Sequence, residues 1–390
     1  MSAAEVISLG CRLNIAESER IRSLVAGENV VVVNSCAVTS EAVRQTRQAI
    51  RKARKARPDA RLLVTGCAAD IEREQLAAMP EVDGLIANET KLDARAWNVP
   101  EPEAAVPTKH TRAFIAVQNG CDHSCTFCVI PQGRGRSRSL TISQVLKEIE
   151  RHLALNAPEV VLTGVDVTSW GHDLPDKPPL GSLVRAILET FPELQRLRMS
   201  SLDGIEIDEE LFELFAGEQR LMPHLHLSLQ HGHDLILKRM KRRHLRADAV
   251  DIVQRLKARR PELAVGADLI AGFPTECEEH HAANRSIIAE LGVVHGHIFP
   301  YSPRPGTPAA RMPQLDRAVI KARAAELRKA VAIERGKWLQ SLVGTPLSVL
   351  TETDGTGYSP NFARVAVPQG TPEGSIVTIT PRRLEEGLLK

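Results

Sequence analysis

The chain has 390 residues, of which 43% are hydrophobic and 25% charged, and its formal net charge is +2. These values are typical of a globular protein, and at about 150 residues per domain the length predicts two or three domains. No apolar run reaches the ~18 residues that a membrane helix needs, and no secretory signal is visible, so we expect no membrane partner and a cytoplasmic location. Seven cysteines in such a chain favour free thiols and metal binding over disulfides.

Residues 1–100 alternate between apolar strand patterns and amphipathic helix patterns. Helices are predicted at Ser18–Val25 and Ser40–Ala56. This alternation predicts an α/β domain with a doubly wound parallel sheet. The predicted strands are Glu5–Leu9, Asn29–Val33, Arg61–Thr65 and Val82–Ala87.

Three cysteines of this domain follow the predicted strands. Cys11, Cys36 and Cys67 each stand one to three residues beyond a strand end. Because the carboxyl ends of parallel strands line one crevice, we expect the three thiols to converge there. Three thiolates are one ligand short of the usual four of an iron–sulfur cluster, so this trio predicts a cluster with an open position. Gly10 and Gly66 precede two of the cysteines and allow a close backbone turn.

The Pro-rich stretch Asn98–Pro107 is a predicted linker, after which strands and helices alternate again over residues 108–335. Helices are predicted at Thr141–Leu155, Pro179–Thr190 and Ala247–Arg260. Six βα units predict a partial (βα)6 barrel with its chemistry at the carboxyl ends of the strands. The predicted strands are 113–118, Glu159–Val165, Leu197–Ser200, His224–Leu229, Val265–Ile270 and Val293–Phe299.

The first barrel strand leads into Cys121, Cys125 and Cys128, which have C-x3-C-x2-C spacing. This trio is also one ligand short of a closed site, and so predicts a metal centre with one open position. A zinc site completed by His123 is an alternative, and so are three unliganded core cysteines. Cys277 is predicted not to bind metal. Small and polar residues that follow the other barrel strands are candidate cofactor contacts: Gly164, Asp166, Ser201, Gln230 and Asp268.

Basic residues are bunched at Arg44–Arg57, Arg134–Arg138 and Lys238–His244. Most such runs are solvated helix faces, but three of them in one chain favour a polyanionic partner. From about Gly336 the pattern changes. A basic helix over Arg317–Leu342 leads into short alternating strands, which predict a small antiparallel β-barrel over residues 336–390. Such a module suits RNA binding, oligomerisation or a purely structural role.

The Cys121 motif, with Phe127 before its third cysteine, resembles the signature of radical S-adenosylmethionine (SAM) enzymes. That resemblance implies a [4Fe–4S] cluster on the three thiolates. The fourth iron would chelate SAM and generate a 5′-deoxyadenosyl radical, with Phe127 against the adenine. The whole chain resembles the methylthiotransferases, which have an N-terminal methylthiotransferase domain, a radical SAM core and a C-terminal TRAM domain. Motifs similar to the branch that acts on N6-threonylcarbamoyladenosine in tRNA are Ser8–Asn14, Val33–Thr39, Gly164–Ser169, Arg198–Asp203 and Pro223–His231.

The resemblance implies two [4Fe–4S] clusters, with Cys11, Cys36 and Cys67 holding the second. SAM would serve as methyl donor and radical source, and a methylthio group would be transferred to C2 of the nucleoside. The implied partners are the tRNA anticodon stem-loop, a reducing electron donor and a sulfur source. We predict that phosphates near the anticodon are contacted by Arg134, Arg136, Arg138, Lys241, Arg242 and Arg243.

Three alternatives remain open from the sequence. Related branches of the family act on isopentenyladenosine in tRNA or on an aspartate of a ribosomal protein. A non-catalytic iron–sulfur RNA-binding protein is the alternative from another class. The chain departs from the family pattern in two places. The segment between Cys11 and Cys36 is short, which predicts a trimmed first helix. The usual Gly-Phe-Pro-Gly-Glu-Thr reads Gly272-Phe-Pro-Thr275-Glu-Cys277 here.

Overall fold

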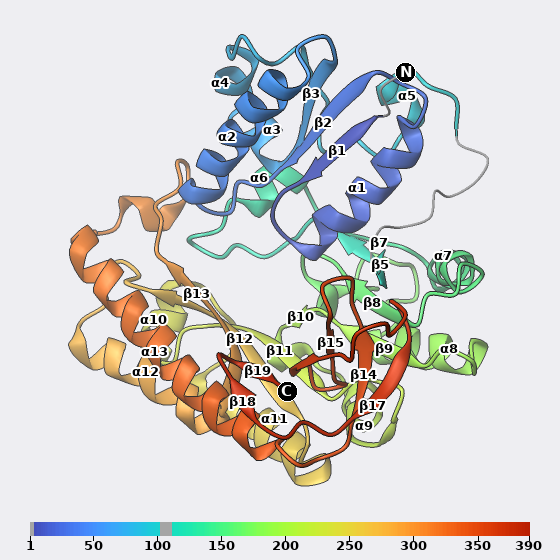
Figure 1. Cartoon of the computed structure of the whole chain (residues 1–390). Coiled ribbons are helices and arrows are strands. Elements are labelled where there is room, and N and C mark those ends of the chain that lie inside the picture. The colour runs from blue at the N-terminus through green and yellow to red at the C-terminus, as the bar shows by residue number, and fades with distance from the viewer. Residues whose placement is uncertain (1–3, 102–110) are drawn as a thin grey trace.

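The computed structural model describes residues 4–101 and 111–390. An N-terminal parallel sheet, six parallel barrel strands and a C-terminal sheet follow one another along the chain (Figure 1). Most of the predicted linker Asn98–Pro107 and the predicted domain start at residue 108 lie outside the described residues. Within the described residues, no helix has the length and apolar character needed to span a membrane.

The N-terminal sheet has four parallel strands in the order β1-β2-β3-β4. Its strands are β1 Glu5–Ser8, β2 Val30–Ser35, β3 Arg61–Gly66 and β4 Gly84–Leu85. Its helices are α1 Arg12–Leu24, α2 Ser40–Ala56, α3 Cys67–Ile71, α4 Arg73–Ala77 and α5 Ala94–Trp97.

Strand β2 explains why this sheet has helices on both faces. Its four consecutive valines are buried, with Val31 and Val33 packed in the core on the α2 side. Val30 and Val32 pack in the core on the α1 and α5 side. An unbroken apolar strand is expected where both faces are covered. The first helix starts at Arg12 rather than at the predicted Ser18, because the extended backbone of Cys11 provides the N-cap without a capping side chain.

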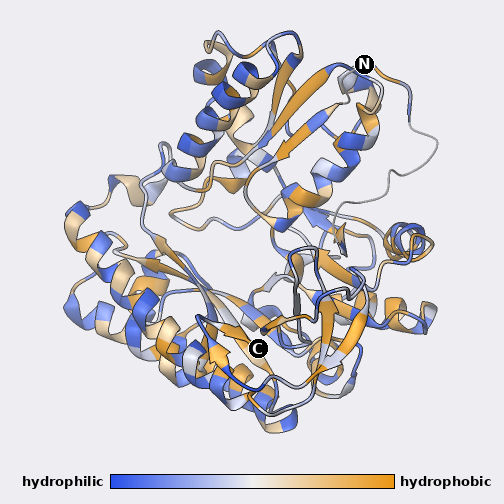
Figure 2. Ribbon diagram, in the orientation of Figure 1, coloured by the Kyte–Doolittle hydropathy of each residue, from blue (hydrophilic) through white to orange (hydrophobic). Residues whose placement is uncertain are grey.

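The middle of the chain forms the predicted barrel. Strand β9 and strand β10 are successive pieces of one strand, interrupted at Ser200, and they link two hydrogen-bonded sheets of parallel strands. The strands are β5 Arg112–Ala116, β8 Glu159–Thr163, β9 Arg196–Met199, β10 Ser201–Leu202, β11 His224–Gln230, β12 Ala264–Ala271 and β13 Val293–Pro300. Apolar strands line the interior of the fold and the outer helices carry the polar residues (Figure 2).

The outer helices of the barrel are α7 Ile142–Leu153, α8 Leu180–Thr190, α9 Glu209–Gly217, α11 Arg246–Arg259, α12 Glu278–Leu291 and α13 Arg317–Ser341. Helix α7 begins with a capping box in which Thr141 and Gln144 satisfy each other's backbone N–H groups. Shorter elements stand at the carboxyl ends of the strands, where they shape the site. They are the hairpin of β6 Gln118–Asn119 and β7 Arg138–Ser139, and the helices α6 Ile130–Arg134 and α10 Asp234–Arg239.

The C-terminal sheet has six strands in the order β17-β14-β15-β16-β19-β18, antiparallel except for the β16–β19 pair. They are β14 Leu347–Thr351, β15 Thr356–Tyr358, β16 Arg364–Ala366, β17 Ile376–Ile379, β18 Leu384–Glu385 and β19 Leu388–Leu389. The sheet packs against the amino ends of the barrel strands. There, Arg196 donates to the carbonyls of Ser348 and Tyr358, and the ring of Phe362 stacks on His224.

Candidate metal centres and active site

The first cysteine trio lies in the loop that follows β6. Backbone N–H groups of His123 and Ile130 approach the sulfurs of Cys121 and Cys128, each at 3.4 Å. Burial raises the pKa of Cys121 to about 12 and that of Cys128 to about 11. The charges of the other two cysteines of the trio also act to raise the pKa of Cys121. The thiols of Cys121 and Cys128 are therefore protonated near pH 7 unless a metal takes the proton's place.

The structure also brings the second trio together. Burial raises the pKa of Cys36 to about 11, with contributions from the charges of Cys67 and Cys11. Gly10 has φ of +100°, and a Cβ there would lie 2.8 Å from the Cβ of Cys36. Gly66, with φ of +90°, would clash with the backbone of Ser35 if it carried a side chain. Glycines thus allow three strand ends to approach each other at the thiols.

The two trios face each other between the N-terminal sheet and the barrel. Helix α3 begins at Cys67 and packs against α6, the helix that follows Cys128 (Figure 1). Gly133 of α6 approaches Cys67 so closely that a Cβ on Gly133 would lie 3.4 Å from the Cβ of Cys67. A charge on Cys67 raises the pKa of Cys128. Groups bound by the two trios would therefore share one space.

A buried ionic network holds the sheet against the barrel in this position. Glu17 of α1 pairs with Lys91 at 2.6 Å and with Arg134 of α6 at 2.8 Å, and its side chain is 0% exposed. Arg134 also donates to the side chains of Asn14 and Asn119. Burial opposes ionisation of Glu17, but the two cations keep its pKa below the ordinary value. The sequence drew attention to Asn14 only as part of the Ser8–Asn14 motif. Sequence reasoning missed Glu17, because the first helix was predicted to begin after it, and Lys91, because it stands outside any motif.

Arg134 requires a correction, because its side chain is only 3% exposed and its donors are used by Glu17. It is not available to a phosphate. Arg242 requires the same correction. Its side chain is 8% exposed and pairs with Asp203 at 2.7 Å, and it approaches the sulfur of Cys125 at 3.8 Å. The side chains of both arginines place positive charge within the site. A nearby cation favours the thiolate form of a cysteine over its thiol form.

The other predicted phosphate contacts lie at the surface. Arg136, Arg138 and Lys241 are exposed, and the side chain of Arg136 makes a long contact of 3.4 Å with Asp122. The side chain of Arg243 is 45% exposed and forms ion pairs with Asp203 and Glu206. A further basic groove of about 440 Å³ lies on the predicted basic helix α2, and it is lined by residues that include Arg44, Arg47, Arg51 and Arg304.

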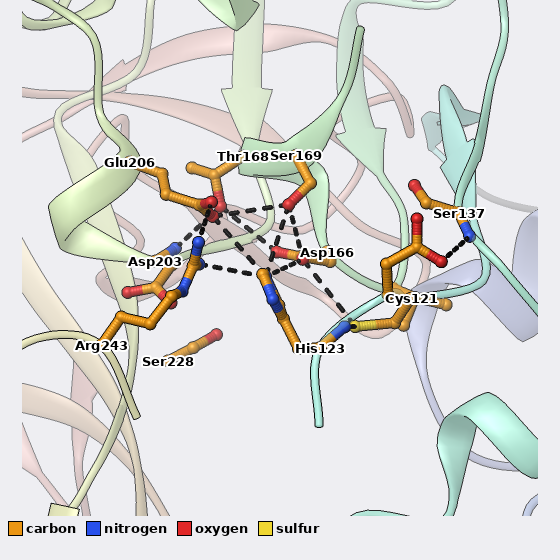
Figure 3. Close-up of polar contacts among 12 residues, drawn as sticks. Cys121, His123, Ser137, Asp166, Thr168, Ser169, Asp203, Glu206, Ser228 and Arg243 are labelled. Atoms are coloured by element: carbon orange, nitrogen blue, oxygen red, sulfur yellow. Dashed lines mark hydrogen bonds and ion pairs between the residues drawn. The ribbon is translucent and has the colours of Figure 1, made fainter. Parts of the chain in front are cut away.

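His123, the proposed fourth ligand of the zinc alternative, is bonded to Asp166 instead (Figure 3). Their side chains meet at 2.7 Å, and this contact raises the pKa of His123. Asp166 also accepts from Ser169 at 2.7 Å. The ligand atoms of Cys121, His123 and Asp166 lie within 4.8 Å of one another, so these three could hold an ion. This three-residue group includes neither Cys125 nor Cys128, so it does not account for the C-x3-C-x2-C spacing.

The remaining candidate cofactor residues lie near the carboxyl ends of the barrel strands or in the loop that carries the first cysteine trio. The ring of Phe127 stands edge-on to Phe273, with 6.5 Å between centroids. Gly164 lies against Gln118, where a Cβ would approach the Gln118 carbonyl oxygen to 2.9 Å. Gln230 is held in a left-handed conformation, with φ of +67°. Thr275 is also left-handed, at +68°, which explains why the family pattern has glycine there.

Asp268 is the centre of a polar group inside the barrel. His226 and His297 each approach one carboxylate oxygen of Asp268 at 3.0 Å, and Ser201 reaches the other at 3.5 Å. Burial opposes ionisation, but the two histidines hold the pKa of Asp268 well below its usual range. The three residues come from adjacent strands, because Asp268 pairs in register with His297 and β11 lies on the other side. Sequence reasoning singled out Asp268 and Ser201 but neither histidine.

Two family models match the chain, the radical SAM superfamily over residues 115–285 and the uncharacterized protein family UPF0004 over residues 3–87. The chain is 44% identical to the threonylcarbamoyladenosine tRNA methylthiotransferase MtaB of Rickettsia prowazekii, covering 99% of this chain and 96% of that protein. It is 30% identical to MtaB of Bacillus subtilis, covering 97% and 93%. It is also 30% identical to the tRNA-2-methylthio-N(6)-dimethylallyladenosine synthase of Paracoccus denitrificans, covering 89% and 85%.

Among solved structures, the radical SAM methyltransferase TsrM of Kitasatospora setae shares the fold. Its TM-score is 0.56 at 15% identity, and the match covers 80% of this chain and 77% of TsrM. Both the predicted α/β fold with a barrel and the predicted family are therefore confirmed. Family members work with SAM and iron–sulfur clusters. The chain belongs to the radical SAM methylthiotransferases, in the branch of the threonylcarbamoyladenosine tRNA methylthiotransferases.

Proposed function

We propose that this chain transfers a methylthio group to C2 of N6-threonylcarbamoyladenosine beside the anticodon of tRNA. Cys121, Cys125 and Cys128 hold one [4Fe–4S] cluster, and Cys11, Cys36 and Cys67 hold the other. When bound, the clusters and SAM supply the radical chemistry, the methyl group and the sulfur. The observation that supports this assignment is the approach of Cys67 to Gly133 of α6, the helix that follows Cys128, where the sheet meets the barrel.

The chain's own residues position these groups and exclude water. The Glu17–Lys91–Arg134 network fixes the separation of the two trios, because its members come from α1, from the loop after β4 and from α6. Arg242, next to Cys125, offsets the negative charge of the first trio. Asp166 holds His123 beside Cys121. Phe127, Gly164, Ser201, Gln230 and Asp268 line the mouth where SAM and the base would meet.

The domain division 1–100, 108–335 and 336–390 is part of the proposal, with the last as a TRAM-like module. Arg136, Arg138, Lys241 and Arg243 are the remaining phosphate contacts. The reaction also needs a reducing electron donor and a sulfur source. We place it in the cytoplasm, since its relatives are named for tRNA modification and none of the seven cysteines, all of which lie in the described residues, forms a disulfide.

Anaerobic reconstitution followed by an assay on an anticodon stem-loop RNA tests the proposal. We expect about eight irons per chain and a 2-methylthio product on RNA that carries N6-threonylcarbamoyladenosine. An iron content of about four per chain would contradict the presence of the second cluster. A product on isopentenyladenosine RNA alone would move the chain to the other branch, and SAM cleavage with neither product would leave the substrate unidentified.

A further inference from the structure

Arg12 places its side chain in the interior of the barrel, where no described residue forms an ion pair with it. It is the first residue of α1 and directly follows Cys11. Its guanidinium carbon lies 5.6 Å from the ring centre of Phe362, the residue that also stacks on Arg198 and His224. Among the described residues, the Arg12 side chain makes no hydrogen bond and no ion pair. A guanidinium has five N–H donors, so this position leaves them to water or to a ligand.

The nearby carboxylates do not supply the missing partner. Glu159 and Asp268 are near enough to affect the pKa of Arg12, but both are already held by other residues. Glu159 accepts from Arg198 at 2.7 Å and from Arg112 at 3.0 Å. Asp268 is shared by two histidines. Moreover, Nη2 of Arg112 is buried without a hydrogen-bond partner.

Asp268 and the side chains bonded to it place further polar atoms in the interior of the barrel. His226, Asp268 and His297 stand on the three neighbouring strands β11, β12 and β13. The side chain of His297 is 61% exposed, so it faces open space rather than the core. Ser201 adds a hydroxyl next to Asp268. A ligand that enters the barrel mouth would therefore meet one unpaired cation together with hydrogen-bond donors and acceptors.

We propose that Arg12 binds the carboxylate of the threonyl group of the substrate nucleoside, and that Asp268 and His297 bind its hydroxyl and ureido N–H groups. This inference rests on the proposed function. The threonylcarbamoyl group carries one carboxylate, which matches the unpaired guanidinium of Arg12, and bidentate pairing is the geometry that arginine favours. An isopentenyl group has no polar atom and would leave the half-buried Arg12 cation unpaired. Arg12 is then a specificity-determining residue that separates the two nucleoside substrates.

The test compares two stem-loop RNAs with the holoenzyme. One carries N6-threonylcarbamoyladenosine and the other carries the same nucleoside with its carboxylate as the methyl ester. Each RNA is titrated for Kd and assayed for KM with the wild type, Arg12→Met and Arg12→Lys. Arg22→Met, on the same helix, is the matched control, and iron content and 5′-deoxyadenosine formation report on the clusters.

We expect the wild type to bind the acid at least about tenfold more tightly than the ester. Arg12→Met should lose that preference, Arg12→Lys should keep part of it, and Arg22→Met should keep all of it. Equal binding of acid and ester by the wild type would overturn the inference, and this comparison needs no variant to fold. Equal losses of Arg12→Met on both RNAs would also overturn it, since a phosphate contact or a structural role would act on both. If the proposed function fails instead, no RNA yields a methylthio product, whatever the binding preference.

Discussion

The two cysteine trios reach similar arrangements by different routes. Cys121, Cys125 and Cys128 come from one loop of eight residues, held by its own backbone contacts to sulfur. Cys11, Cys36 and Cys67 come from the ends of three strands and meet only when the sheet has formed. We therefore expect Cys121, Cys125 and Cys128, the local trio, to keep their arrangement when the N-terminal sheet is destabilised. Cys11, Cys36 and Cys67, the non-local trio, should lose theirs. Closing the chain between distant ligands costs conformational entropy, which the sheet must offset.

Removing one ligand from each trio should have the largest effect. Cys125→Ala should abolish 5′-deoxyadenosine formation and methylthio transfer, because SAM is activated at the local trio. Cys67→Ala should abolish methylthio transfer but retain SAM cleavage, and iron content should fall from about eight to about four in both variants. The matched control is Cys277→Ala, an exposed cysteine outside both trios. Loss of SAM cleavage in Cys67→Ala would show that the trios are not separable.

Glu17→Gln should damage the non-local trio through the network beside it. The substitution leaves Lys91 and Arg134 buried without their counter-charge, which costs about 3–5 kcal/mol. Urea unfolding followed by far-UV circular dichroism measures this loss, and SAM cleavage should survive better than methylthio transfer. Glu41→Gln, which breaks the exposed pair with Arg44, should leave the unfolding curve unchanged. Equal curves for the two variants would contradict the role of the network.

The barrel, which carries the local trio, should lose stability in acid. Burial of Glu159 opposes its ionisation, but Arg198, Arg112 and Arg196 lower its pKa to about 2, against an ordinary 4.5. Its contribution is therefore present above pH 4.5 and is lost as the pH falls from 4.5 towards 2, an effect of order 3 kcal/mol. Thermal unfolding across this range should show a flatter pH dependence in Glu159→Gln than in the wild type. Parallel curves would mean that other carboxylates carry the acid sensitivity.

The smallest effect is expected from the exposed cations that flank the local trio. Replacing Arg136, Arg138 and Lys241 together by alanine should weaken stem-loop binding and make the slope of log affinity against log salt shallower by about 2. A triple alanine variant of Lys147, Arg151 and Arg255, on the outer helices α7 and α11, is the control. A slope that changes equally in both variants would indicate only general attraction between the protein and RNA.

Much of this architecture could be predicted from the sequence because it follows local rules. The spacing of Cys121, Cys125 and Cys128 predicts a three-ligand centre whatever the rest of the chain does. Alternation of apolar and polar residues predicted the barrel strands to within a few residues, and the strand ends predicted where Cys11, Cys36 and Cys67 would meet. These inferences need only the geometry of strands and the rule that parallel strands share one carboxyl edge.

Only the tertiary structure decided which charges face solvent and which are buried. Arg134, Arg136 and Arg138 look alike in sequence, yet Arg134 is buried because Glu17, 117 positions earlier, lies opposite it. Arg242 and Arg243 are also neighbours in sequence, yet the side chain of Arg242 is buried and that of Arg243 is exposed. Arg12 has no partner among the described residues because Glu159 and Asp268 are already bonded to other side chains. The physical reason is that secondary structure follows from neighbours in the chain, whereas the pairing of a charge depends on residues that only folding brings within a few ångströms.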